Sequence, residues 1–466
     1  MKRILCVLLT IYILIQPIGI FAEKGSAGSE AFDPAELKSE AVILVESESG
    51  EILYSKNENK KMYPASMTKV MTALLAIENL DMNEVITVGS EINLKEPDAS
   101  SAGLRRGEQL TNEDLLRGLL IPSGNDAAYT VAVQVARKVS GDSSLPVGAA
   151  LEYFYEMMNK RAKEIGAENT NFVNPHGYHD DNHYTTAYDQ YIIAREAMKH
   201  EVFRNIVKTR AYSTEESSGT GGEGSAKRVP HQWYNRNLML NKNSKYYYEH
   251  ATGIKTGYTS DSGYCLVSSA SDGNLSVIAV VMNAPTDEAR WEDSKNLLKY
   301  GLENFEFQTI LKKDQVICNV KVGKRFRSKT EEIAVVSDKD YTSIFNKSDI
   351  PNIKENIAWN EELIDKNYEE KHGSVRLLGP ITKGQVLGKV TYTLDDKTIV
   401  ESDLLAEKDA MELNVFDHVL NAGYFVAEHW KLFVISIVAL AVLIVVLRVT
   451  ALKRRKKKSQ WSYRNY

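Results

Sequence analysis

The chain has 466 residues, of which 43% are hydrophobic and 26% are charged, and its net charge is −5. Its length exceeds that of a usual single domain and its composition is that of a globular protein, so we expect two folded domains. Lys2, Arg3 and the eight cations from Arg448 onward leave a net charge of −15 on residues 23–447. This acidic main body excludes nucleic acid as a partner.

Residues 1–22, MKRILCVLLTIYILIQPIGIFA, have the pattern of a signal peptide. Two cations precede an apolar run, and small or apolar residues end the segment at Ala22. An uncleaved anchor is the alternative for this pattern. In either case the sequence predicts that most of the chain is exported and that the first folded domain covers residues 23–308.

This first domain begins with strands, continues with helices and returns to strands. AVILVE (Ala41–Glu46) and EILYS flank the turn SESG and predict a β-hairpin. Apolar residues then recur at helical spacing after Pro64, from Thr111 to Val139 and from Leu151 to Ile165. The polar, glycine-rich stretch Ser213–Lys227 predicts an exposed loop between strands.

A different pattern begins after this domain. Short alternating runs such as EIAVVS and VLGKVTYTL are separated by charged turns. They predict a separate β-rich domain over residues 309–405. A juxtamembrane helix or linker is expected over residues 406–430.

The next segment, Leu432–Leu447, has 16 consecutive uncharged residues, and residues 431–452 are long enough to span a bilayer as one helix. A basic tail, residues 453–466, follows and contains KRRKKK. The positive-inside rule places this tail in the cytoplasm. We therefore expect a protein of the cell membrane with a single C-terminal anchor and an extracytoplasmic catalytic domain.

Three cysteines are present, of which Cys6 belongs to the predicted signal peptide. Cys265 stands in the apolar run GYCLVSSA and is interpreted as a buried strand residue rather than half of a disulfide with Cys318. The fold is therefore not expected to depend on disulfides.

The stretch PASMTK places Ser66 three residues before Lys69 at the start of a helical pattern. Pro64 precedes them, so Ser66 is expected in the first helical turn, where the positive end of the helix dipole favours developing negative charge. Residues i and i+3 share a helix face, so the lysine amine can reach the serine hydroxyl. A lysine with a lowered pKa can take the serine proton, which makes this pair a candidate nucleophile and base.

Two further motifs follow in the chain. Ser123 and Asn125 share one tight turn, where a hydroxyl can relay a proton and an amide can hold a substrate amide. Lys255-Thr256-Gly257 opens a strand pattern. The lysine and threonine can hold a substrate carboxylate, and the glycine, without a Cβ, lets a substrate lie against the strand.

The ordered set S-x-x-K, S-x-N and K-T-G is typical of penicillin-interacting serine enzymes. With the stretches LRRGEQLTNEDLLRGLLIPSGNDAA, NFVNPHGYHDDNHYTTAYD, NRNLML and APTDEARWEDSKNLLKYGL, the chain resembles the low-molecular-mass penicillin-binding proteins, which are serine-type D-alanyl-D-alanine carboxypeptidases. The resemblance implies an α/β (α+β) catalytic domain similar to serine β-lactamases, with a five-stranded antiparallel sheet between helices. A small β-rich domain and a C-terminal transmembrane helix would follow, and no cofactor or metal is implied.

For the reaction, the resemblance implies that Ser66 attacks the carbonyl between the two terminal D-alanines of a peptidoglycan stem pentapeptide. Lys69 would be the general base, Ser123 would pass a proton to the leaving amine, and Asn125 would align the substrate amide. Water would then release the acyl-enzyme, and β-lactams would acylate the same serine as covalent inhibitors.

The resemblance also assigns the carboxylate-binding residues. Lys255 and Thr256 would bind the terminal carboxylate, with help from Arg290, and the backbone N–H groups of Ser66 and Tyr258 would form the oxyanion hole. Tyr258 stands where many relatives have histidine. This departure affects only the expected fine specificity.

Three alternatives remain open from sequence. A β-lactamase shares the three motifs but needs a loop glutamate, and EVFRN at Glu201 lacks the leucine of an E-x-x-L-N sequence. A zinc D,D-peptidase could use His176, His179 and His183 with Asp180 as metal ligands. A non-hydrolytic module that binds wall peptides or β-lactams would not require the intact nucleophile.

Overall fold

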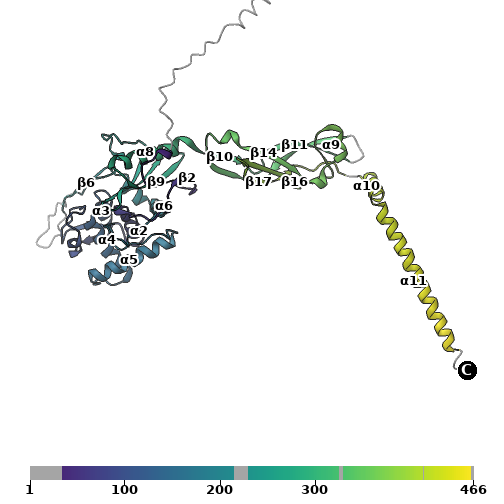
Figure 1. Cartoon of the computed structure of the whole chain (residues 1–466), viewed down its shortest axis with the longest axis horizontal. Helices are drawn as coiled ribbons and strands as arrows, with labels where there is room; N and C mark the ends of the chain where they lie inside the picture. Colours follow the sequence, from purple (N-terminus) through teal and green to yellow (C-terminus); the bar gives the residue numbers. More distant parts are fainter. Residues whose placement is uncertain (1–33, 215–228, 325–328, 413, 463–466) are drawn as a thin grey trace, which may run out of the picture. The chain divides into compact units, whose positions relative to one another are not determined.

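The computed structural model describes residues 34–214, 229–324, 329–412 and 414–462. The predicted signal peptide, most of the predicted loop Ser213–Lys227 and the end of the basic tail lie outside these described residues. The chain divides into two compact units, Met1–Phe305 and Glu306–Tyr466, and Figure 1 labels several elements of each. This division falls three residues before the expected boundary between residues 308 and 309.

The first unit is built on a five-stranded sheet with the strand order β2-β1-β9-β8-β7, in which all neighbours are antiparallel. Its strands are β1 (Ala41–Glu46), β2 (Ile52–Lys56), β7 (Ala251–Thr259), β8 (Gly263–Ser271) and β9 (Ser276–Ala284). The expected five-stranded antiparallel sheet is therefore confirmed, and so is the hairpin at its start.

Two small two-stranded sheets and seven α-helices accompany this sheet in the described part of the unit. The small sheets pair β3 (Val85–Thr87) with β4 (Gln109–Thr111) and β5 (Ala211–Ser213) with β6 (Gln232–Tyr234). The helices are α2 (Lys69–Asn79), α3 (Asn112–Leu120), α4 (Asn125–Ser140), α5 (Val147–Glu164), α6 (Ala187–Met198), α7 (Glu201–Val207) and α8 (Asp287–Asn304). The predicted helical segments are confirmed, with a break at Ser123 between α3 and α4.

Side chains of the central strands alternate between two buried faces. Ala41, Ile43 and Val45 of β1 belong to the large core that also contains the residues of α2 and α4. Leu44 points the other way and packs on α8, where a Cβ at Gly301 would lie 3.2 Å from its Cδ2. Because a strand turns successive side chains to opposite faces, the sheet is covered by helices on both sides. Cys265 of β8 is fully buried and free, as predicted.

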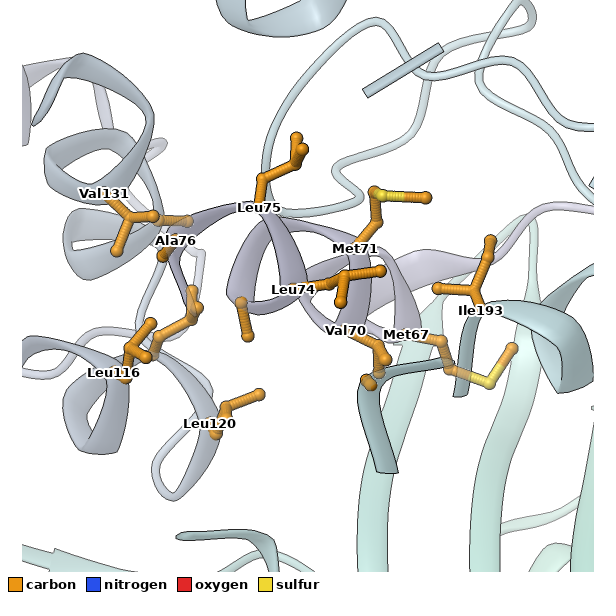
Figure 2. Close-up of a cluster of buried hydrophobic side chains, with 14 of the residues drawn as sticks. Met67, Val70, Met71, Leu74, Leu75, Ala76, Leu116, Leu120, Val131 and Ile193 are labelled. Carbon is orange, nitrogen blue, oxygen red and sulfur yellow. The ribbon is translucent and has the colours of Figure 1, made fainter. Parts of the chain in front are cut away.

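The helix that carries Lys69 lies at the centre of this core. Every residue from Lys69 to Ala76 is buried, and Figure 2 shows the apolar side chains of α2 beside those of the neighbouring helices, with Leu116 and Leu120 from α3, Val131 from α4 and Ile193 from α6. Truncating a buried leucine to alanine in such a core costs about 2–5 kcal/mol. The packing therefore fixes the position of the helix and of the residues at its N-terminus.

The position of Ser66 differs from the expectation in one detail. Ser66 does not lie in the first turn of an α-helix. It belongs to the 3-10 turn η2 (Ala65–Thr68), and α2 begins only at Lys69. Ala65 enters this turn with a φ of +47°, a left-handed conformation that non-glycine residues seldom adopt. The backbone N–H of Met67 bonds to the oxygen of Pro64 at 3.2 Å, which gives the i to i+3 pattern of a 3-10 turn.

The second unit contains a β-rich domain, as expected. A six-stranded sheet has the order β14-β16-β17-β12-β11-β15, and β10 pairs with β13. The strands are β10 (Phe305–Leu311), β11 (Val316–Gly323), β12 (Thr330–Ser337), β13 (Tyr341–Asn346), β14 (Lys354–Trp359), β15 (Arg376–Leu378), β16 (Val386–Leu394) and β17 (Lys397–Ala406). The helix α9 (Lys366–His372) interrupts the strands and was not expected from the alternating pattern.

Two helices follow the β-rich domain. A capping box between Asn414 and Asp417 starts α10 (Val415–Glu428). The next helix, α11 (Trp430–Ser462), contains the segment Trp430–Arg454, which is long and apolar enough to cross a membrane and is not buried in the protein. This segment includes the predicted span of residues 431–452 and is a candidate membrane anchor.

Candidate active site

The serine of the first motif is half-buried on η2 and lines a cavity, whereas Ala65, Met67 and Thr68 around it are buried. The positive φ of Ala65 just before Ser66 is a conformation that costs about 1–3 kcal/mol for a non-glycine residue and is concentrated at functional sites. The turn therefore holds the Ser66 hydroxyl at the wall of the cavity.

Lys69 is fully buried, and its amine is surrounded by three oxygen atoms. Its Nζ lies 2.9 Å from Ser66 Oγ, 2.7 Å from Asn125 Oδ1 and 2.9 Å from the backbone oxygen of His176. Burial and the nearby charge of Arg236 lower the pKa of Lys69 to about 7. An amine with this pKa is neutral in about half of the molecules at neutral pH.

The second motif lies in the turn between α3 and α4. Ser123 is 2% exposed, has a φ of +67° and lines the same cavity as Ser66. Within the described residues its hydroxyl makes no hydrogen bond with Ser66 or Lys69. Asn125, the first residue of α4, is the member of this motif that contacts Lys69 directly.

The residue after this motif, Asp126, fixes the neighbouring loop and was not singled out from the sequence. Its buried carboxylate accepts hydrogen bonds from Ser101 Oγ at 2.6 Å and from the backbone N–H groups of Ala102 at 2.8 Å, Gly103 at 2.9 Å and Leu104 at 3.0 Å. Ser101 lines the cavity. Asp126 therefore joins one cavity wall to the start of α4.

The third motif lies in the middle of β7, the edge strand, rather than at its start. The structure also places Lys255 differently from the expectation. Lys255 is 2% exposed, and its Nζ donates a hydrogen bond to the backbone oxygen of Thr256 at 2.9 Å. Burial and the charges of Lys69, Arg236 and Arg290 hold the pKa of Lys255 well below its usual range.

A glycine is required at position 257 by close packing, which the sequence did not reveal. A Cβ at this position would lie 2.9 Å from the backbone oxygen of Pro64 and 3.2 Å from the Cβ of Ala65. The missing side chain therefore lets the turn that carries Ser66 approach β7. Gly257 also lines the cavity, so the same position remains next to any bound substrate.

Seven of the nine predicted site residues line one cavity of about 880 Å³, and Lys69 and Lys255 are buried behind it. The seven are Ser66, Ser123, Asn125, Thr256, Gly257, Tyr258 and Arg290. Arg236 lines the same cavity and was missed as a site residue, although it stands in the stretch NRNLML. Its charge lowers the pKa of both Lys69 and Lys255, and no spacing in the sequence indicates this effect.

Arg290 and Tyr258 form one side of the cavity. Arg290 Nη1 donates to the backbone oxygens of Gly257 at 3.1 Å and Cys265 at 3.4 Å, and its Nη2 forms an ion pair with Asp287. Its buried Nε has no hydrogen-bond partner among the described residues. Tyr258 is 55% exposed and stacks on the ring of Tyr264 at 4.5 Å.

Two of the three histidines of the zinc alternative, His183 and His176, are engaged in hydrogen bonds of their own. Both ring nitrogens of His183 are engaged, one with Thr68 Oγ1 at 2.8 Å and the other with the backbone N–H of Val173 at 3.1 Å. His176 Nδ1 accepts from the backbone N–H of Tyr178. Within the described part of the chain, no group of three His, Cys, Asp or Glu residues is arranged to hold a metal ion.

The sequence and the fold both match known proteins. Residues 28–286 match the peptidase S11 family of D-alanyl-D-alanine carboxypeptidases, and residues 305–412 match the C-terminal domain of penicillin-binding protein 5. The D-alanyl-D-alanine carboxypeptidase DacF of Bacillus subtilis is 32% identical over 417 residues, which cover 88% of this chain and 95% of that protein.

Two solved structures are also similar. Penicillin-binding protein 5 of Haemophilus influenzae has 29% identity and a TM-score of 0.54, with 82% of this chain and all of that chain covered. The Streptomyces K15 DD-transpeptidase has 31% identity and a TM-score of 0.52, with 57% of this chain and 98% of that chain covered. These matches do not favour the β-lactamase or zinc alternatives, and they show that the chain belongs to the serine-type D-alanyl-D-alanine carboxypeptidase family of low-molecular-mass penicillin-binding proteins.

Proposed function

We propose that this serine D-alanyl-D-alanine carboxypeptidase uses Ser66 as its nucleophile and Lys69 as its base, and that its substrate is the D-alanyl-D-alanine end of peptidoglycan stem pentapeptides. The observation that carries the proposal is the contact between the Lys69 amine and the Ser66 hydroxyl at 2.9 Å, at the wall of the cavity. The products are D-alanine and a stem shortened by one residue, which limits the donors available for cross-linking.

The surroundings of Lys69 support its role as a base. A neutral amine has two N–H groups and one lone pair. The oxygens of Asn125 and His176 can only accept hydrogen bonds, so they take up both N–H groups. The remaining lone pair can accept the proton of Ser66 when Ser66 Oγ attacks.

In the first step, a bond forms between Ser66 Oγ and the substrate carbonyl carbon, and the bond from this carbon to the nitrogen of the last D-alanine breaks. The serine proton goes first to Lys69, and Ser123, which lines the same cavity, takes this proton from Lys69 as it gives its own to the leaving amine. The backbone N–H groups of Ser66 and Tyr258 stabilise the oxyanion. Water then gives a proton to Lys69 and adds to the acyl carbon, and the bond from this carbon to Ser66 Oγ breaks as Oγ takes that proton back.

The terminal carboxylate of the substrate requires a positive site next to β7. Thr256, Arg236 and Arg290 line the cavity and can contact it directly, and Lys255 lies behind the wall with its amine bonded to the backbone oxygen of Thr256. β7 is the edge strand of the sheet, so its outer edge can pair with an extended peptide as an additional strand. This places the peptide carbonyl beside η2.

We also propose the cellular setting. The segment Trp430–Arg454 anchors the chain in the cell membrane, with the basic tail in the cytoplasm and the catalytic domain outside. In this arrangement residues 1–22 are the signal peptide, residues 23–308 are the catalytic domain and residues 309–405 are a spacer toward the wall. β-Lactams bind to Ser66 because their strained amide resembles the D-alanyl-D-alanine end.

The test compares the full chain with its Ser66→Ala variant on a diacetylated Lys-D-alanyl-D-alanine tripeptide. The full chain is expected to release D-alanine, and the variant is expected to lose at least about a thousandfold in rate. A Thr87→Ala variant, on the small two-stranded sheet of β3 and β4 and outside the cavity, is the matched control and should keep the activity. Full D-alanine release by the Ser66→Ala variant would contradict the proposed nucleophile.

A further inference from the structure

A second cavity of the first unit lies at the opposite end of the sheet from the reaction centre. It has a volume of about 650 Å³ and is bounded by α6, α7 and the ends of β1, β7, β8 and β9. On β7 it includes Thr252, whereas the reaction cavity includes Thr256, four residues further along the strand. At about 3.3 Å per residue, the two positions are about 13 Å apart.

The walls of this cavity are rich in cations. Arg195, Lys199, Arg204 and Lys208 line it, together with two carboxylates, Glu48 and Glu201. Lys199 is paired with Glu196 at 2.5 Å. Among the described residues, the other three cations have no carboxylate within ion-pair distance.

These unpaired cations contrast with the net charge of −15 on residues 23–447. The four cations and two carboxylates of the lining leave it a net charge of +2, and a positive concave site raises the local concentration of anions. The contrast therefore marks this cavity as a site that attracts anions on an otherwise acidic protein.

Backbone oxygens hold Arg195 and Arg204 in place and leave some of their N–H donors available. Arg195 donates from Nε to the backbone oxygen of Ser47 at 2.8 Å and from Nη2 to that of Glu48 at 2.5 Å. Arg204 donates from Nη1 to the backbone oxygens of Met198 at 2.6 Å and Lys199 at 2.8 Å. A guanidinium has five N–H donors, so each arginine is fixed and still has N–H groups for an anion. Fixing these side chains in advance lowers the entropy cost of binding.

The floor of the cavity adds hydroxyl groups beside apolar side chains. Thr252 and Ser269 share a hydrogen bond of 2.7 Å, and Ser276 donates to Ser271 at 2.9 Å. Val277 and Ile278 also line it. Hydroxyls both donate and accept hydrogen bonds, so this floor suits the oxygen atoms of a chain that carries phosphate or carboxylate groups.

We propose that this cavity binds a polyanionic cell-wall chain, with phosphate or carboxylate groups held by Arg195, Arg204 and Lys208, away from the reaction centre. This inference rests on the proposed function in one respect only. An enzyme that acts on peptidoglycan meets the anionic chains of the cell wall, so they are the expected ligand. The binding itself follows from the cavity and its charges. A second contact of this kind would keep the enzyme on the wall between reactions at neighbouring stems.

The test measures binding of three labelled polymers to the full chain in detergent, by fluorescence anisotropy in about 50 mM salt, where charge interactions are weakly screened. Polyphosphate and poly-L-glutamate represent the two anionic groups, and dextran is the neutral control. The variant Arg204→Gln/Lys208→Glu reduces the positive charge of the cavity, and the new amide side chain would still offer a donor to the carbonyls of Met198 and Lys199. The matched control Lys160→Glu/Lys163→Gln makes the same change in net charge on exposed positions of α5.

We expect at least one polyanion to bind and dextran not to bind, and the cavity variant to weaken polyanion binding about tenfold while the α5 control changes it by less than about twofold. The preferred polymer then identifies phosphate or carboxylate as the ligand group. The proposal is overturned if both variants weaken binding equally, or if no polyanion binds more tightly than dextran.

D-alanine release from the tripeptide is measured on the same samples. We expect about equal release from the full chain and both variants, which also shows that they are folded. If the cavity variant loses its D-alanine release, a milder pair replaces the first one. The milder cavity variant is Arg204→Gln/Lys208→Gln, and its control is Lys160→Gln/Lys163→Gln. Absence of D-alanine release from the full chain itself would contradict the proposed function. The polymer-binding measurement would still test whether the second cavity binds polyanions.

Discussion

The amine of Lys69 lies 2.7 Å from the side-chain oxygen of Asn125, although the two residues belong to different motifs and different helices. This contact connects the first motif to the second. Together with the backbone oxygen of His176 it fixes the amine next to Ser66. The geometry of the proposed nucleophile and base therefore depends on the packing of α2 against α4 as much as on the spacing of Ser66 and Lys69.

The lowered pKa of Lys69 predicts a pH profile. Below pH 7 the amine is protonated and cannot accept the serine proton, so the rate of Ser66 acylation should fall about tenfold per pH unit. Above pH 7 the amine is neutral and the rate should level off. Labelled penicillin and a rapid-quench measurement between about pH 5 and pH 9 give this rate. A rate that still rises about tenfold per pH unit at pH 9, as the ordinary lysine pKa of about 10.4 would give, would contradict the assignment.

Arg236 predicts a shift of this profile. After burial, its charge is the largest cause that lowers the pKa of Lys69. An Arg236→Ala variant should therefore move the midpoint of the acylation profile to higher pH, and should also raise KM for a substrate with a terminal carboxylate. Arg236→Lys keeps the charge and is the matched control, with a midpoint close to that of the parent. An unchanged midpoint in Arg236→Ala would show that the charge of Arg236 does not lower the pKa of Lys69.

Asp126 predicts a loss of stability. Replacing it with alanine would leave three backbone N–H groups of the loop without their acceptor, so the free energy of unfolding should fall by about 3 kcal/mol. Glu152→Ala, on the exposed side of α5, is the control and should change it by less than about 0.5 kcal/mol. Urea unfolding followed by D-alanine release reports on the catalytic unit. Equal stability of the two variants would show that Asp126 does not fix the loop.

Gly257 predicts a steric effect on the nucleophile. In Gly257→Ala the new Cβ would lie 2.9 Å from the backbone oxygen of Pro64, so the turn with Ser66 has to move away from β7. A displacement of about 1 Å at a reacting group costs about a hundredfold in rate. Gly148→Ala is the control, because a Cβ there meets open space on α5. Acylation by labelled penicillin measures both variants, and a rate within about twofold of the parent for Gly257→Ala would contradict this explanation.

The C-terminal helix predicts the membrane association of the chain. A chain that ends at residue 412 lacks Trp430–Arg454 and should be soluble without detergent. Its D-alanine release from a short tripeptide should stay within about twofold of that of the full chain, because the cavity lies entirely in the first unit. Sedimentation with membranes separates the two forms. Membrane pelleting of the shortened chain would show that another segment provides the anchor.

The elements that the sequence predicted well depend on local patterns. The β-hairpin at Ala41–Glu46, the helix after Pro64 and the apolar segment before the basic tail follow from the alternation or run length of nearby residues. The three motifs were found because each is short and each residue type has a defined chemical use. Their order along the chain then made the family resemblance possible.

The features that the sequence did not predict depend on contacts between distant segments. Arg236 acts on Lys69 only because the chain brings their charges together in space. The 3-10 turn at Ser66 follows from the left-handed conformation of Ala65, which is unusual for alanine. The hydrogen bond from the buried Lys255 amine to the backbone oxygen of Thr256 was not predicted either, and the role of Lys255 in binding a carboxylate stays a prediction.

The central claim is that Ser66 forms a covalent acyl-enzyme without a metal, and one mass measurement tests it most directly. The full chain is incubated with penicillin, with and without a chelator, and the peptide that contains Ser66 is identified after digestion. We predict that this peptide gains the mass of one penicillin in both samples and that the Ser66→Ala variant gains none. An unmodified Ser66 peptide, together with D-alanine release that the chelator abolishes, would contradict the account and would favour the histidine cluster around His176.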